Sequence, residues 1–238
     1  MRKILIILSL LYIGLYANLI EDGIAESKKG NYQKAKEAFE ASCNTGNAKG
    51  CTLLGVSYIA GNKINQNKSK ARSLFNKSCD MGDYEGCFNL AEIYRYGDGI
   101  EKDINKACDL YDKSCEGNVA VACMKLGIMY VTGSIKDSSG VKTAKAFRKA
   151  CDGKNLKGCR FLGLMHLMGR GVKKDIKKGK KLLETACNGG DAEGCFNLGL
   201  LYAKGEGVKR DEKIATKLFA KACSKGSQEG CKAHKIFK

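Results

Sequence analysis

The residues of this chain best suited to chemistry are its 13 cysteines. Twelve form pairs eight residues apart, and each pair follows the previous one after 36 residues. Such an array either binds metal or forms disulfides. Zinc sites usually space cysteines two to four residues apart and often add histidine, whereas these pairs are wider and the chain has two histidines. We therefore expect disulfides, with no metal and no cofactor, that join Cys43 with Cys51, Cys79 with Cys87, Cys115 with Cys123, Cys151 with Cys159, Cys187 with Cys195 and Cys223 with Cys231.

The spacing within each pair requires a turn. Eight residues of continuous helix span about 12 Å, but a disulfide needs Cα atoms roughly 4.4–6.8 Å apart. The segments between the cysteines, such as NGGDAEG at 188–194, are rich in Gly, Asn and Asp, as turns are. Each disulfide is therefore predicted to join the end of one helix to the start of the next.

Helical patterns occupy the stretches between the pairs. Residues 194–205 carry apolar residues at close to a 3.6-residue period, which predicts a first helix of each repeat, the A helix. Residues 211–223 represent the second, or B, helix. The glycines after the A helices, from Gly61 to Gly205, suit left-handed C-terminal caps. The sequence predicts about thirteen helices, with B-helix N-caps at Asn67, Asp103, Ser139, Asp175 and Asp211.

The repeat unit resembles Sel1-like repeats, which are relatives of tetratricopeptide repeats. Residues 194–223, GCFNLGLLYAKGEGVKRDEKIATKLFAKAC, are the clearest copy, and the cysteine pairs resemble those of exported cysteine-rich Sel1-like proteins of bacteria. This resemblance implies an all-α fold, a right-handed α/α superhelix (solenoid) with one disulfide per repeat. It also implies a penicillin-binding protein or slow β-lactamase, or a secreted factor that contacts host cells.

Four segments follow from the pattern. Residues 1–17 have the layout of a signal peptide, with two cations before an apolar run and a small residue. Residues 18–46 are expected to form an N-terminal tetratricopeptide-like repeat, 47–226 five Sel1-like repeats, and 227–238 a capping helix. A retained membrane anchor is the alternative for the N-terminus. The expected location is outside the cytoplasm, secreted or periplasmic, with no membrane span after cleavage of the signal.

The chain is strongly basic, with a formal net charge of +17. Loss of Arg2 and Lys3 with the leader would leave +15. Such a charge attracts anionic polymers or membrane surfaces, but lysines on solvated helix faces explain it equally and are the preferred interpretation. The sequence has no nucleic-acid recognition motif, and no nucleic-acid partner is expected.

A serine β-lactamase is expected to carry S-x-x-K together with S-D-N and K-T-G. The chain has a single S-x-x-K, from Ser139 to Lys142, and neither other motif. Ser139 also occupies the N-cap position of its repeat, so no catalytic nucleophile is assigned. His166 takes the place held by Tyr58, Tyr94 and the equivalent tyrosines of other repeats, which favours a packed histidine over a catalytic base.

Cys108 is the thirteenth cysteine and has no partner eight residues away. Equivalent positions hold Lys36, Arg72, Ala144, Lys180 and Thr216, which predicts partial exposure. It is expected to be an incidental thiol in a monomer, with a Cys108-linked dimer as the alternative.

Ligand binding is expected on the concave surface that A helices line in superhelices of this kind. Asn89, Lys125 and Asn197 share one A-helix position, and Tyr96 lies two turns after Asn89. Asparagine can donate to and accept from a peptide backbone, and lysine can meet a carboxylate. Exposed polar residues without function are the alternative.

The function expected from the sequence is the first of two, and the second is its alternative. The first is a weak β-lactamase that binds β-lactams or peptidoglycan-like small molecules, and it rests on family resemblance alone. The second is a non-enzymatic solenoid that binds an extended peptide, cell-wall fragments or a protein partner, because solenoids present extended surfaces.

Overall fold

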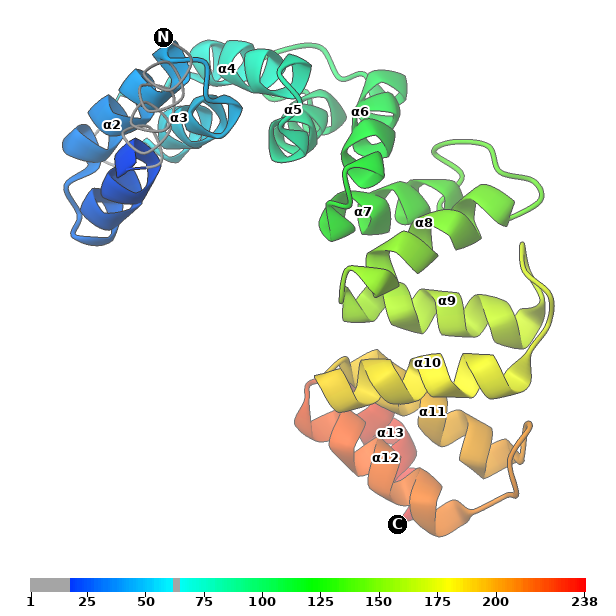
Figure 1. The fold of residues 1–238 in the computed structure, drawn as a ribbon. Helices are drawn as coiled ribbons and strands as arrows, with labels where there is room; N and C mark the ends of the chain where they lie inside the picture. The colour runs from blue at the N-terminus through cyan, green and yellow to red at the C-terminus, as the bar shows by residue number, and fades with distance from the viewer. Residues whose placement is uncertain (1–17, 62–64) are drawn as a thin grey trace, which may run out of the picture. The chain divides into compact units, whose positions relative to one another are not determined.

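The computed structural model describes residues 18–61 and 65–238, and those residues contain helices and no strands. The expected signal peptide, residues 1–17, lies outside the described part. Residues 18–28 are helical, and the following helices are α2 (Tyr32–Asn44), α3 (Ala48–Ala60), α4 (Lys68–Asp80), α5 (Tyr84–Tyr96), α6 (Ile104–Glu116), α7 (Ala120–Val131), α8 (Val141–Asp152), α9 (Leu156–Met168), α10 (Ile176–Gly189), α11 (Ala192–Lys204), α12 (Glu212–Ser224) and α13 (Gln228–Phe237) (Figure 1). The all-α solenoid expected from the repeat is confirmed.

The chain divides into two compact units between Ser114 and Cys115. In each unit, B helices with even numbers alternate with A helices with odd numbers, and consecutive helices pack on each other, as α3 does on α4 and α9 on α10. Neighbouring A helices also contact each other, α3 with α5 and α9 with α11. Within each unit, a repeat thus buries its apolar side against its neighbour, as stacked repeats must.

Local capping sets the ends of the helices. Asn67, Asp175 and Asp211 accept a hydrogen bond from a backbone N–H three residues later, as predicted for B-helix N-caps. After the A helices, Gly61 and Gly169 have φ of 64° and 72°, the left-handed region that only glycine enters freely. In these repeats the capping residues of the sequence therefore mark where the B helices begin and where the A helices end.

Close packing of A on B helices depends on glycine. A Cβ atom at Gly127 would lie 2.4 Å from the ring of Phe147, and one at Gly199 would lie 2.6 Å from the ring of Phe219. Both phenylalanines are fully buried. The missing side chain allows the aromatic ring of the B helix to reach the backbone of the A helix.

All six predicted disulfides are present, and each closes the turn from a B helix to the next A helix. Their Cα–Cα distances are 4.4–4.6 Å, within the range that a disulfide requires. The bonds join Cys43 to Cys51, Cys79 to Cys87, Cys115 to Cys123, Cys151 to Cys159, Cys187 to Cys195 and Cys223 to Cys231. The pairing therefore agrees with the spacing of eight residues in every repeat.

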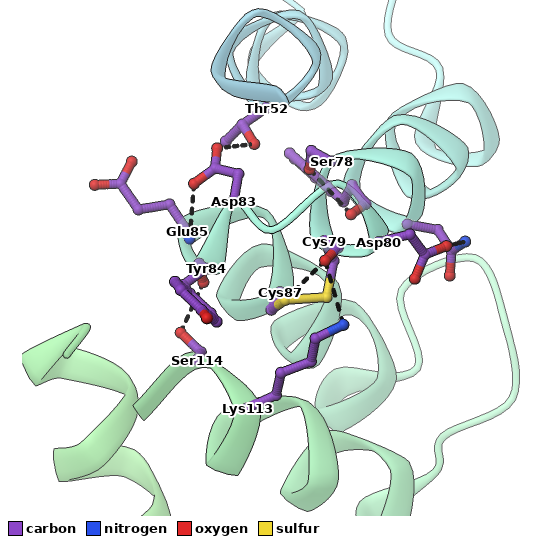
Figure 2. The surroundings of a disulfide bond; sticks show 12 residues. Thr52, Ser78, Cys79, Asp80, Asp83, Tyr84, Glu85, Cys87, Lys113 and Ser114 are labelled. Atoms are coloured by element: carbon purple, nitrogen blue, oxygen red, sulfur yellow. Dashed lines mark hydrogen bonds between the residues drawn. A yellow bond between two sulfur atoms is a disulfide. The ribbon is translucent and has the colours of Figure 1, made fainter. Parts of the chain in front are cut away.

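The bridge between Cys79 and Cys87 lies among contacts between successive repeats (Figure 2). Lys113 of α6 donates to the carbonyl oxygen of Cys79 at 3.2 Å. Thr52 of α3 donates to the carboxylate of Asp83 at 2.6 Å. The covalent turn is thus also a contact point for its neighbours.

Removing one bridge should destabilise the protein measurably. In a double variant that carries Cys187→Ala and Cys195→Ala, loss of the loop of about nine residues should cost about 2–3 kcal/mol in the chain-entropy model. Thermal unfolding followed by circular dichroism should show a lower Tm with helical signal retained at low temperature. A Cys108→Ala variant is the control, since Cys108 forms none of the six bridges. An unchanged Tm in the double variant would contradict the expectation.

Candidate functional site

A groove lies between the A helices α3 and α5 in the N-terminal unit. Its volume is about 480 Å³, and its wall is largely apolar. The residues that shape it include Val56, Ile59, Asn89, Glu92, Ile93 and Tyr96. We call this feature the A-helix groove. Its size falls within the range of ligand pockets in proteins.

Helical spacing places these side chains together. Asn89, Glu92 and Tyr96 follow one another at three and four residues on α5, so they lie along one stripe of that helix. Val56 occupies on α3 the repeat position that Glu92 occupies on α5. Tyr96 is 64% exposed and Val56 is 43% exposed, so apolar surface faces solvent beside the polar groups.

The B helix α6 supplies a polar support for Glu92. The hydroxyl of Tyr111, a fully buried side chain, donates to the Glu92 carboxylate. Burial raises the pKa of Tyr111, and the hydrogen bond to Glu92 raises it further, so the phenol stays protonated and remains a donor. The Glu92 carboxylate is therefore oriented by a residue from the next helix of the chain.

Charges at the rim of the groove are partly compensated. Asp98, which lines the groove, forms an ion pair with Lys68. The guanidinium of Arg95 lies 4.9 Å from the ring centre of Tyr96. The rim thus offers both signs of charge around an apolar floor.

A second, smaller hollow of about 250 Å³ adjoins the same helix α3. Residues 18–28, α2 and α3 line it, with Ile24, Tyr32, Leu53 and Val56 among its residues. Val56 belongs to both hollows. The two features together extend the accessible apolar surface along the A helices of the N-terminal unit.

The structure brings together two of the four residues expected to bind ligand. Asn89 and Tyr96 both line the A-helix groove. Lys125 lies on α7 and Asn197 on α11, both in the C-terminal unit. The amide of Asn197 donates to the carbonyl of Glu193 on its own helix at 2.8 Å. The role of these four residues in ligand binding stays a prediction.

The sequence pattern did not single out Glu92 or Val56. Both stand one helical turn after the position that Asn89 shares with Leu53, so the same repeat alignment could have found them. What it could not show is the hydrogen bond from Tyr111, because that residue comes from a different helix.

The N-cap assigned to Ser139 is wrong. Helix α8 begins at Val141, after Gly140 with φ of 73°, and Asp137 accepts from the backbone N–H groups of Gly140 and Thr143. The Ser139 hydroxyl donates to Asp137 at 3.1 Å. The Ser139 hydroxyl also accepts from the backbone N–H of Val141 at 3.2 Å, so the serine lies one residue before the N-cap Gly140 and shares the first turn of α8 with the Asp137 carboxylate.

The same geometry gives Ser139 no activating base. Burial raises the pKa of Asp137, but the hydrogen bonds from Thr143 and Ser139 outweigh it and leave the pKa below its ordinary value. A carboxylate with a lowered pKa accepts a proton poorly. The S-x-x-K match is thus part of a helix-capping loop.

His166 is a packed histidine, as expected. It is 5% exposed, and its Nδ1 atom lies 3.3 Å from the carbonyl oxygen of Lys173. Burial lowers the pKa of His166 despite that hydrogen bond. Tyr58 and Tyr94 occupy the repeat position of His166, and each of their rings lies beneath a lysine. The ammonium of Lys70 is 4.9 Å from the ring centre of Tyr58, and that of Lys106 is 4.3 Å from the ring centre of Tyr94.

The expected partial exposure of Cys108 is wrong. The side chain is 9% exposed and buried on α6. At equivalent positions Lys36 and Lys180 extend across the rings of Tyr58 and Tyr202. Long cationic side chains reach water from such a site, whereas a cysteine is too short to do so. Burial of the thiol gives no support to a Cys108-linked dimer.

Within 18–61 and 65–238, no three His, Cys, Asp or Glu side chains gather as a metal site would require. Over the same ranges, no helix has the length and apolar character needed to cross a bilayer.

The family model of the Sel1 repeat matches five consecutive segments, residues 48–83, 85–119, 120–155, 156–191 and 192–227. No curated protein sequence matches the chain. The matches support the cysteine-rich Sel1-like repeat expected from the sequence. They give no support to the expected β-lactamase, penicillin-binding or antibiotic-resistance function.

Several solved structures are similar. A Sel1 repeat protein from Oxalobacter formigenes is 26% identical with a TM-score of 0.78, over 92% of this chain and 86% of that one. The antigen c5321, described as protective and present in uropathogenic Escherichia coli strains, is 28% identical with a TM-score of 0.76 over 86% of this chain. This chain spans only 44% of c5321. Helicobacter pylori cysteine rich protein B is 38% identical with a TM-score of 0.45, over 57% of this chain and 98% of that one.

Replacing His166 with tyrosine should reduce the loss of folding stability that occurs when the pH is lowered. The pKa of His166 is lowered in the folded protein, so the unfolded chain binds more protons as pH falls below about 6.5, and stability drops. In His166→Tyr this loss should disappear, because tyrosine does not titrate in this pH range. Urea unfolding midpoints at about pH 5.5 and 7.5 measure it. A His234→Gln variant is the control and should keep the pH dependence, and an unchanged dependence in His166→Tyr would contradict the assignment.

Proposed function

Because the chain belongs to the Sel1 repeat family, we propose that it is a non-enzymatic binding scaffold. Its ligand in this proposal is an extended peptide segment of a partner protein, held in the A-helix groove. The observation that carries the proposal is the groove itself, which combines an open, largely apolar wall with the amide of Asn89 and with the Glu92 carboxylate that Tyr111 orients.

The groove has the chemistry that an extended peptide needs. The apolar side chains Val56, Ile59 and Ile93 offer burial to ligand side chains, which is worth roughly 25 cal/mol per Å². The amide of Asn89 can donate to and accept from a peptide backbone. The exposed ring of Tyr96 adds the aromatic anchor that is common in binding hot spots.

The repeats also favour a scaffold over an enzyme. Ser139 belongs to a capping loop, and His166 is packed in the core. Neither of them lines the A-helix groove or the smaller hollow beside it. A binding surface needs no activated nucleophile, so the side chains of the groove suffice.

Export remains part of the proposal. Six disulfides, one in each B-to-A turn, suit an oxidising compartment such as the periplasm or the cell exterior. Most of the bonded cysteines are buried, which limits the access of reductants to them. We propose secretion or periplasmic residence on this ground, with a protein partner met in the same compartment.

Selection from a random displayed-peptide library against the oxidised protein should yield peptides that bind the A-helix groove. For a selected peptide, Tyr96→Ala should weaken binding by about tenfold or more, as expected for an aromatic hot spot. Tyr84→Ala is the matched control, since Tyr84 is an exposed tyrosine at the opposite end of the same helix. Isothermal titration calorimetry measures both. Selected peptides that lose equal affinity in both variants, or none in either, would place binding elsewhere.

The same preparation should not hydrolyse a chromogenic cephalosporin. The expected rate equals that of a mock purification from the same host, because no activated nucleophile has been found among the candidate residues. Turnover that exceeds the mock and rises in proportion to protein concentration would contradict the non-enzymatic proposal.

A further inference from the structure

The two units of the chain differ sharply in charge. Residues 1–114 carry 16 Lys and Arg against 14 Asp and Glu, whereas residues 115–238 carry 26 against 11. Nearly all of the net charge of +17 therefore belongs to the C-terminal unit. Lysines that merely solvate helix faces would be expected in both units, because both are built from the same repeat.

The excess is concentrated on the B helices of that unit. Helices α8, α10 and α12 together carry eleven Lys and Arg against three Asp and Glu. The B helices α2, α4 and α6 carry eight against six. Figure 1 shows α8, α10 and α12 alternating with α9 and α11 in the C-terminal unit.

One repeat position shows the change of sign most clearly. In successive B helices that position holds an exposed side chain, and it reads Glu37, Ser73, Asp109, Lys145, Lys181 and Lys217. Packing is equivalent along this row, so the helix fold does not require lysine there. The three lysines are a property of the C-terminal unit, not of the repeat.

More lysines extend this row on each helix. Positions three and four residues before the row lie on the same helix face, and most of them are exposed lysines. We call the whole set the basic face, which consists of Lys142, Lys145, Lys177, Lys178, Lys181, Lys213 and Lys217. The acidic residues of these helices are few, and Glu184 and Glu212 pair with Lys180 and Arg210.

The basic face also carries exposed apolar side chains. Val141 is 57% exposed in the first turn of α8, and Ile214 is 38% exposed in the first turn of α12. They occupy the same repeat positions as Lys177 and Lys178. Lysines interspersed with exposed aliphatic side chains suit the interface of an anionic bilayer, where the cations meet headgroups and the aliphatic groups meet the acyl boundary.

Other anionic partners fit less well. The aromatic residues of α8, α10 and α12 are Phe147 and Phe219, both fully buried, so no ring is available to stack on nucleic-acid bases. The lysines extend over three successive repeats, and a small anion would reach only one or two of them. An extended anionic surface engages them together.

We propose that the basic face of the C-terminal unit docks the protein on anionic lipid bilayers. This activity goes beyond the peptide binding assigned to the A-helix groove and does not depend on it. The lysines supply attraction to the headgroups, and Val141 and Ile214 supply shallow apolar contact. The attachment is peripheral and electrostatic, so salt should release it.

Cosedimentation with vesicles tests the proposal. The full, oxidised chain is mixed with phosphatidylcholine vesicles that contain phosphatidylglycerol at about a third of the lipid, or none. The wild-type protein should bind only the anionic vesicles and should dissociate as salt rises. Vesicles of phosphatidylcholine alone control for insertion through any apolar segment.

Two matched variants distinguish binding through the basic face from attraction by the net charge of the whole protein. The triple variant Lys145→Gln, Lys181→Gln, Lys217→Gln should weaken binding by about tenfold or more, since each lysine near an anionic surface contributes severalfold. The control variant Lys157→Gln, Lys225→Gln, Lys232→Gln removes the same charge from exposed positions outside the basic face and should change binding far less. Circular dichroism verifies that both variants are folded.

Three results would overturn the proposal. Equal loss in both variants would show attraction by net charge without a docking face. Equal binding to vesicles with and without phosphatidylglycerol would remove the electrostatic basis. Binding to heparin or duplex DNA without binding to anionic vesicles would assign the face to a soluble polyanion instead of a bilayer.

Discussion

Two cysteines eight residues apart can bond only if the helix carrying the first ends before the second. Every repeat of this chain obeys that constraint, with Cα–Cα distances of 4.4–4.6 Å across the B-to-A turn. The bridge holds the end of one helix against the start of the next. It thereby fixes the turn by which each B helix passes into the following A helix.

The packing that follows gives the two helix types different tasks. A helices carry glycine where the B-helix ring approaches, as at Gly127 against Phe147, and they also contact neighbouring A helices. The A-helix groove of the N-terminal unit forms between two such helices. B helices keep an exposed row that packing leaves unconstrained, and in the C-terminal unit lysine occupies that row. The exposed side chains available for binding therefore differ between the two units, whereas the packing of A on B helices is the same in both.

Some predictions failed where the contacts or the length of an individual side chain, and not its repeat position, decide its environment. Ser139 stands in the N-cap column, but the N-cap residue is Gly140, and Asp137 accepts from the backbone N–H groups of Gly140 and Thr143. Cys108 stands in a column that holds Lys36, Arg72 and Lys180 in other repeats, but it lacks the length to reach solvent and is buried. The orientation of Glu92 could not be predicted, because its partner Tyr111 comes from the next helix. Alignment of repeats reports average positions, whereas these cases depend on individual side chains.

The sequence by itself determined the repeat period, the disulfide pairs, the helix order and most of the caps. These features are local, because turn glycines, capping aspartates and a cysteine spacing of eight act within a single repeat. Only the tertiary structure decided which side chains meet across helices: the position of Glu92 and Val56 beside Asn89 and Tyr96, the hydrogen bond from Tyr111 to Glu92, and the burial of Cys108. The physical reason is that burial and side-chain contact arise from the stacking of repeats, and stacking joins residues about 36 positions apart that no local pattern connects.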